Sequence, residues 1–219
     1  MRTHQLNTLL RRALLALVLG ASAAVASAET LHVEVDTSAF GSEGWIDLLF
    51  LASNGKAAAA TASLTSFVGF DATIPAQPFG GVSGSLANGY TLSSLNSGAE
   101  LFHAVHFGGK VSFNVDFSGA VAEAINRVPS TFTVAMYGAD QTTLLGHGDK
   151  ASGALVQLYW LPSISSGTDG TVSSHVFDNV ASLSPATAVP EPSSWAMMGA
   201  GLGLLGWARR RKNGAVFKA

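Results

Sequence analysis

Two histidines three residues apart, His103 and His106, carry the side chain that binds metal ions most often in proteins. They lie within residues 101–107, a mostly apolar run that predicts a β-strand. Side chains three residues apart in a strand point to opposite faces of the sheet. We therefore expect the two imidazole rings to diverge, so that they do not share a metal ion.

A second group of metal-binding residue types lies in the predicted loop 138–150, which contains Asp140, His147 and Asp149. Carboxylates and backbone carbonyls are the ligands that calcium prefers. The loop lacks the dense Asp/Asn/Gly spacing of known calcium loops, so we interpret these side chains as solvated turn residues. Calcium binding stays open as the alternative, and no other metal or cofactor is predicted.

Signatures of a catalytic nucleophile are absent from the sequence. Serines are numerous, but none lies in a Gly-x-Ser-x-Gly motif. The Gly-rich segment 79–84 precedes no predicted helix, which does not fit a phosphate-binding loop. A glycosidase needs two carboxylates facing one cleft, and the sequence does not choose among its many acidic pairs. We predict a non-catalytic protein, with a secreted hydrolase as an alternative.

Five aromatic residues are candidates for a platform on which sugar rings stack. Exposed aromatic faces of a β-sandwich have this role in carbohydrate-binding modules, so a module of that kind is a further alternative. Packing in the core is the competing interpretation, because buried aromatic side chains dominate the cores of such folds. The five residues are Trp45, Tyr90, Tyr137, Tyr159 and Trp160.

The elements that must position these side chains are predicted to be β-strands. Apolar and polar residues alternate in 31–36, 111–117 and 131–136, which is typical of half-buried antiparallel strands. The apolar runs 45–51 and 154–160 predict strands buried on both faces or lying between two sheets. The expected fold of residues 29–188 is an all-β, antiparallel β-sandwich, jelly-roll-like, without cysteines to form disulfides.

Glycine-rich turns separate the predicted strands. Asn54-Gly55 and Asn88-Gly89 predict hairpins with type I′ turns, and Gly108-Gly109 predicts a third hairpin. Residues 120–126 are a candidate short helix that ends before Pro129. Residues 57–62 are interpreted as strand or loop, despite their alanines.

The beginning of the sequence resembles a secretory signal peptide. Basic residues Arg2, Arg11 and Arg12 precede an apolar run over 13–25 and the small residues Ala26 and Ala28. This order predicts cleavage by signal peptidase after Ala28, so residues 1–28 form a signal helix that is removed.

Residues 189–219 predict a membrane anchor. A proline-broken segment precedes an apolar run over 195–207, flanked by Trp195 and Trp207, which suit the two membrane interfaces. At about 1.5 Å per residue this helix barely spans the inner membrane. The positive-inside rule places the basic block, and the tail 213–219 after it, in the cytoplasm. The block consists of Arg209, Arg210, Arg211 and Lys212.

The basic residues at the two ends of the chain mask, in the total charge, a strongly acidic exported domain between them. The chain has 12 basic and 14 acidic residues, but eight of the basic residues lie in the terminal segments. Residues 29–190 therefore hold 4 basic and 13 acidic residues, a net charge of 4 − 13 = −9. This charge argues against nucleic acid as a partner.

Residues 189–212 resemble a PEP-CTERM sorting signal, a segment also labelled an ice-binding-protein C-terminal domain, a label that carries no evidence of ice binding here. The resemblance is carried by Val189-Pro190-Glu191-Pro192, the short apolar helix and the basic block. It implies a Gram-negative bacterium that makes exopolysaccharide, and an exosortase that recognises Pro190, Glu191 and Pro192 and removes the helix. The expected protein is a transient membrane precursor that reaches the cell surface or the extracellular matrix, where exopolysaccharide is a candidate partner.

Overall fold

The computed structural model describes residues 30–53, 57–95, 98–123 and 127–186, and these residues form β-strands and loops. The chain divides into two compact units, residues 1–186 and residues 187–219. The predicted signal helix and the predicted membrane helix lie outside the described residues. Within the described part, no helix has the length and apolar character needed to cross a lipid bilayer.

The strands form two antiparallel sheets, so the all-β prediction is confirmed. The six-stranded sheet has the order β13-β1-β8-β3-β6-β5. Its strands are β1 (Leu31–Asp36), β3 (Ala60–Val68), β5 (Val82–Ser85), β6 (Gly89–Ser93), β8 (Lys110–Gly119) and β13 (Ala181–Pro185).

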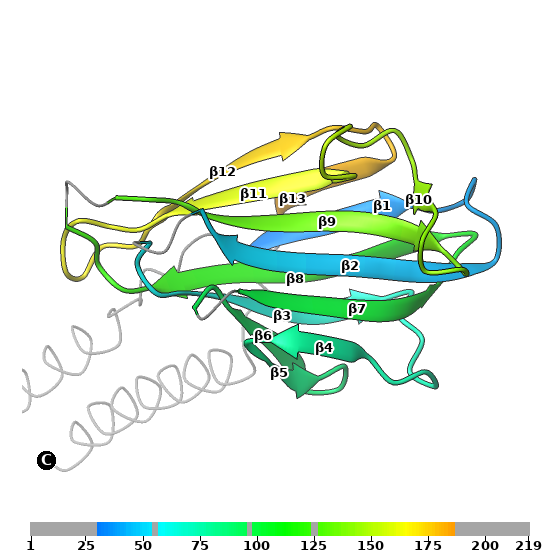
Figure 1. Cartoon of the computed structure of the whole chain (residues 1–219), viewed down its shortest axis with the longest axis horizontal. Helices are drawn as coiled ribbons and strands as arrows, with labels where there is room; N and C mark the ends of the chain where they lie inside the picture. Colours follow the sequence, from blue (N-terminus) through cyan, green and yellow to red (C-terminus); the bar gives the residue numbers. More distant parts are fainter. Residues whose placement is uncertain (1–29, 54–56, 96–97, 124–126, 187–219) are drawn as a thin grey trace, which may run out of the picture. The chain divides into compact units, whose positions relative to one another are not determined.

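The seven-stranded sheet has the order β12-β11-β9-β2-β7-β4, with the short β10 paired to β9. Figure 1 shows β2 between β9 and β7 in this sheet. Its strands are β2 (Glu43–Ala52), β4 (Gln77–Gly80), β7 (Ala99–His106), β9 (Ser130–Gly138), β10 (Leu144–Leu145), β11 (Val156–Leu161) and β12 (Thr171–Val176).

The core lies between the inner faces of the two sheets. The alternation of each strand sends every second side chain inward, and in β2 these are Ile46, Leu48 and Phe50, all fully buried. Phe50 meets Phe117 of the other sheet with ring centroids 5.8 Å apart. Burying a side chain of this kind contributes about 1.5–3 kcal/mol, so the facing rows hold the sheets together.

The predicted hairpins had mixed outcomes. Strands β5 and β6 pair across Asn88-Gly89, which confirms that hairpin. Its turn type was wrong: Gly89 has a φ of +87°, but Asn88 is not among the residues with positive φ. The Asn88 N–H instead donates to the Ser85 carbonyl in an ordinary turn, and Gly89 follows in the left-handed region, as in three-residue hairpins.

The two other hairpin predictions were wrong, because both connections cross from one sheet to the other. β2 belongs to the seven-stranded sheet and β3 to the six-stranded sheet, so the connection holding Asn54-Gly55 joins strands that do not pair. The same applies to β7 and β8 on either side of Gly108-Gly109. Glycine pairs indicate a reversal of the chain, but they do not say which sheet the next strand joins.

The ambiguous segments are resolved in part. The strand-or-loop interpretation of residues 57–62 is confirmed, because β3 begins at Ala60 after a loop. Residues 120–123 are not helical, and residues 124–126 lie outside the described residues. The run 45–51 is fully buried on its inner side only, because Asp47 and Leu49 are half-buried and Leu51 is 38% exposed.

Candidate ligand-binding site

A small aromatic cluster lies on the outer face of the seven-stranded sheet, away from the core. It contains Trp45 of β2, Phe102 and Ala104 of β7, and Tyr137 of β9. Trp45 stacks on Phe102 with ring centroids 5.1 Å apart, and Tyr137 meets the Phe102 ring edge-on at 5.5 Å. These rings form an apolar cluster on the outer face of the sheet.

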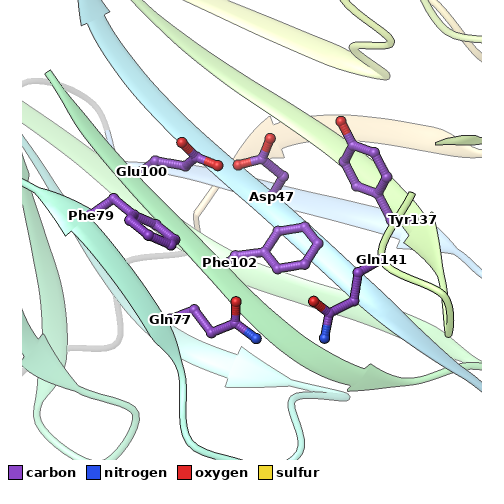
Figure 2. Close-up of a pocket in the computed structure, with 7 residues that line it drawn as sticks. All are labelled: Asp47, Gln77, Phe79, Glu100, Phe102, Tyr137 and Gln141. Atoms are coloured by element: carbon purple, nitrogen blue, oxygen red, sulfur yellow. The ribbon is translucent and has the colours of Figure 1, made fainter. Parts of the chain in front are cut away.

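A pocket of about 260 Å³ lies beside this cluster. Figure 2 shows the carboxyl groups of Asp47 and Glu100 turned toward one another above the Phe102 ring. Asp47 is directly opposite Phe102 in the pairing of β2 with β7, and Glu100 lies two residues before Phe102 on the same face of β7. The pocket is lined by Asp47, Gln77, Phe79, Glu100, Phe102, Tyr137 and Gln141.

Burial in this pocket perturbs the acid–base behaviour of Asp47. Its Oδ1 atom is buried and has no hydrogen-bond partner among the described residues. Burial, and secondly the charge of Glu100, raise the pKa of Asp47 to about 7. Burial also raises the pKa of Tyr137, with smaller contributions from Asp47 and Glu100. Two carboxyl groups therefore share one site, and the carboxyl group of Asp47 resists ionisation there.

A second pocket, of about 210 Å³, is lined by Trp45 and shares Gln141 with the first pocket. In this pocket the Asp71 carboxylate accepts hydrogen bonds from the Thr73 hydroxyl and the Thr73 N–H, and these bonds lower the pKa of Asp71. The Oδ2 atom of Asp71 is 3.8 Å from Nε2 of His106. Gln141 lines both pockets and has a φ of +61°, rare for a residue with a side chain. The pocket is lined by Glu43, Gly44, Trp45, Asp71, Ile74, Ala104, Val105, Ala139 and Gln141.

The predicted aromatic platform is corrected by the structure, because its five members do not share a surface. Tyr90 and Trp160 point inward and are buried in the core, so they cannot stack on a sugar from outside. Tyr159 lies on the outer face of β11, where its hydroxyl donates to Gln157, but it lines neither pocket. Only Trp45 and Tyr137 remain at the site.

Sequence reasoning missed Phe102, Asp47 and Glu100. The nearly continuous apolar run around Phe102 concealed its outward position, because Phe102 and Ala104 on the outer face of β7 are apolar and alternate with Leu101 and Val105 on the inner face. Asp47 had a usable signal, since it is the one acidic residue within the apolar run 45–51. Its pairing with Glu100 depends on the alignment of β2 with β7, which the sequence does not reveal.

The two histidines diverge, as predicted. His103 points into the core, where its ring lies edge-on to Phe70 at 5.2 Å and Nδ1 is 2.9 Å from the Ala104 carbonyl oxygen. Burial lowers the pKa of His103. His106 lies on the outer face and is exposed. The two imidazole rings therefore lie on opposite faces of the sheet.

The acidic side chains of the loop 138–150 accept hydrogen bonds from neighbouring residues of the same turn. The Asp140 carboxylate accepts hydrogen bonds from Thr142 and Thr143, which hold its pKa far below the usual range. Asp149 accepts from Ser152 in the same way. The His147 N–H donates to Asp178, outside this loop. Within the described ranges, no three His, Asp or Glu side chains are placed to hold one metal ion.

The remaining predicted site residues lie outside the described residues. They are Ala26 and Ala28 of the signal cleavage site, Val189, Pro190, Glu191 and Pro192 of the sorting motif, and Trp195, Trp207, Arg209, Arg210, Arg211 and Lys212 of the anchor.

Comparison with known proteins identifies the segment that follows the β-strands. Residues 188–212 match the family model described as the PEP-CTERM protein-sorting motif, which confirms the resemblance. No curated protein and no solved structure matches the chain. The chain therefore carries a PEP-CTERM sorting motif, which marks it as an exosortase-targeted, exported protein of a Gram-negative bacterium with a membrane-anchored precursor.

Proposed function

We propose that this chain is a non-catalytic exported protein that binds polysaccharide at the cell surface or in the exopolysaccharide matrix. The sorting motif supports the destination. The jelly-roll-like interpretation is compatible with the strand order, in which β1, β2, β3 and β4 alternate between the sheets. The binding face is the outer face of the seven-stranded sheet, around Trp45 and Phe102.

The observation that carries this proposal is the combination of an aromatic floor with polar side chains at its edge. Sugar rings have apolar faces that pack against aromatic rings, and hydroxyl groups that need hydrogen-bond partners. Phe79, which is 54% exposed, and Tyr137 supply aromatic surface beside the largely buried Phe102, and the amide groups of Gln77 and Gln141 supply donors and acceptors. Two pockets that share Gln141 as a lining residue suit consecutive units of one polysaccharide chain.

Affinity electrophoresis tests the binding function. The purified full-length chain is run through gels that contain the exopolysaccharide of an exosortase-positive host. We expect retardation of the wild type and little retardation of Phe102→Ala, with Tyr159→Ala as the control on the same sheet face. Equal migration of all three proteins with and without polysaccharide would remove the proposal.

Processing of the two ends is tested by mass spectrometry of the protein from the same host. The model of sorting predicts that the wild type loses residues 1–28 and the segment after the sorting motif. A Glu191→Ala variant is expected to keep that segment, because Glu191 is the one charged side chain of the motif. An intact wild-type chain in the presence of exosortase would contradict the sorting model.

A second candidate function is hydrolysis of glycosidic bonds, which the pairing of Asp47 with Glu100 favours. A carboxyl group with a pKa near 7 beside an ionised carboxylate is the arrangement that many glycosidases use. Against this, Asp47 Oδ1 has no hydrogen-bond partner among the described residues that would orient it as a general acid. Release of reducing ends from the host polysaccharide, lost in Asp47→Asn, would establish this second function.

A further inference from the structure

The two pockets contain acidic groups and no basic side chain of Lys or Arg. Asp47 and Glu100 line the first pocket, and Glu43 and Asp71 line the second. Two basic residues that the structure describes have partners outside the pockets. Lys110 forms an ion pair with Glu34 at 2.7 Å, and Arg127 donates a hydrogen bond to the Pro162 carbonyl. A polysaccharide that carries carboxylate or sulfate groups would meet only like charge on this surface.

Among the described residues that line the first pocket, no Lys or Arg pairs with its carboxyl groups. Within the same part of the chain Asp47 Oδ1 is buried and has no hydrogen-bond partner, and a buried polar atom left in this way destabilises the folded state. Glu100 faces Asp47 from the neighbouring strand, and the two groups repel one another when both are ionised. A cation between them would remove the repulsion and favour the ionised form of both.

The aromatic rings of the same pocket also favour a cation. Figure 2 shows Phe102 below the two carboxyl groups and Tyr137 to one side. The face of an aromatic ring attracts a positive charge within about 6 Å of its centre. Carboxylates and aromatic faces around one small pocket are a combination that binds organic ammonium groups.

We propose that this pocket binds the protonated amino group of an amino sugar, so that the protein selects polysaccharides with free amino groups. This inference rests on the proposed function, because it names the sugar that the outer face binds. The ammonium group lies between Asp47 and Glu100, and the ring of the sugar packs on Phe102. The amides of Gln77 and Gln141 bind the neighbouring hydroxyl groups.

A metal ion fits the pocket less well than an ammonium group. Calcium takes six to eight oxygen ligands, and the two carboxylates and two amides of this pocket reach six only if both carboxylates bind in a bidentate way and both amide oxygens turn inward. An ammonium group needs only three acceptors, which the two carboxylates and one amide oxygen supply. The aromatic rings add attraction for the organic cation and offer no ligand to a metal.

Isothermal titration of the full-length chain tests the inference with three probes of equal length: a glucosamine tetramer, an N-acetylglucosamine tetramer and a glucuronate oligomer. The titrations are done at pH 6.5 in low salt with EDTA. We expect the glucosamine tetramer to bind at least about tenfold more tightly than the acetylated one, a difference of about 1.4 kcal/mol, because only the free amine pairs with the two carboxylates. We expect no detectable binding of the glucuronate oligomer.

Variants of Asp47 and Glu100 show whether the preference for the free amine depends on the charge of the two carboxylates or on the shape of the pocket. Asp47→Asn with Glu100→Gln is expected to abolish the preference for the free amine while binding of the acetylated tetramer persists. Asp169→Asn, an exposed acid that lines neither pocket, is the matched control and keeps the preference. Equal affinity of the two tetramers for the wild type would overturn this inference and leave polysaccharide binding standing. Absence of binding to every probe and to the host polysaccharide would overturn both.

Discussion

Trp45 and Phe102 lie on neighbouring strands and stack almost in parallel, with an interplanar angle of 8°. They belong to the outer face of the seven-stranded sheet, yet they are only 8% and 9% exposed. Each ring therefore covers much of the other, and the pair forms an apolar surface that two pockets flank.

Replacement of Phe102 by alanine should weaken polysaccharide binding about tenfold or more, because stacking of one ring contributes about 1 kcal/mol and the floor of the pocket is lost. Titration with the polysaccharide measures the effect. The variant Tyr159→Ala removes an aromatic ring from the same sheet face outside the pockets, and it should bind like the wild type. Equal losses in the two variants would show that the site is not local to Phe102.

The variant Asp47→Asn should change how stability depends on pH. The pKa of Asp47 is about 7 in the folded protein and 3.8 in the unfolded chain, so the folded state retains a proton that the unfolded state releases between these values. Wild-type stability therefore falls as pH rises from about 4 to 7 on account of this group. We expect Asp47→Asn to be about 1–2 kcal/mol more stable than the wild type at pH 8, with the advantage lost near pH 4.

Urea denaturation at several pH values measures this difference. Glu100 and Tyr137 are the other titratable groups that face Asp47, so Glu100→Gln should produce a smaller change in the same direction. If Asp47→Asn were more stable than the wild type by the same amount at pH 4 and pH 8, the raised pKa of Asp47 would be contradicted.

His103 should produce a pH dependence of the opposite sign. Burial lowers its pKa below the ordinary value of 6.5, so the unfolded chain binds a proton that the folded protein resists. The free energy of unfolding should therefore fall as pH drops from about 7 to 5 on account of this group. In His103→Asn, which keeps a donor for the Ala104 carbonyl, that part of the slope should disappear even though the lost ring lowers stability at every pH.

Gly44 should tolerate no side chain, because a Cβ atom there would lie 2.2 Å from the ring of Phe107 and 2.5 Å from the Tyr137 carbonyl oxygen. We expect Gly44→Ala to destabilise the protein by about 1–3 kcal/mol through overpacking. Gly109→Ala is the control, since nothing lies within 4 Å of a Cβ atom at that position. Thermal unfolding compares the two variants, and similar midpoints would argue against this close contact of Gly44 with Phe107 and with Tyr137 of β9.

The strands and their inner faces were predictable from the sequence, whereas the pairing that builds the site was not. Alternation predicted the strands around Val33, Val115 and Val134, because burial on one face imposes a period of two. It failed for the outer face of β7, where Phe102 and Ala104 are also apolar. The contact of Asp47 with Glu100 joins residues 53 positions apart, and only the register of two strands decides it.

Mapping of the bound sugar by NMR tests the central claim most directly. The backbone amides of the full-length chain are followed while the polysaccharide, or the glucosamine tetramer, is added. We predict shifts at Asp47, Phe102, Tyr137 and Gln141, and unchanged signals on the outer face of the six-stranded sheet, for example at Ser63 and Asn114. Shifts confined to the six-stranded sheet, or no shifts at saturating sugar, would contradict the account.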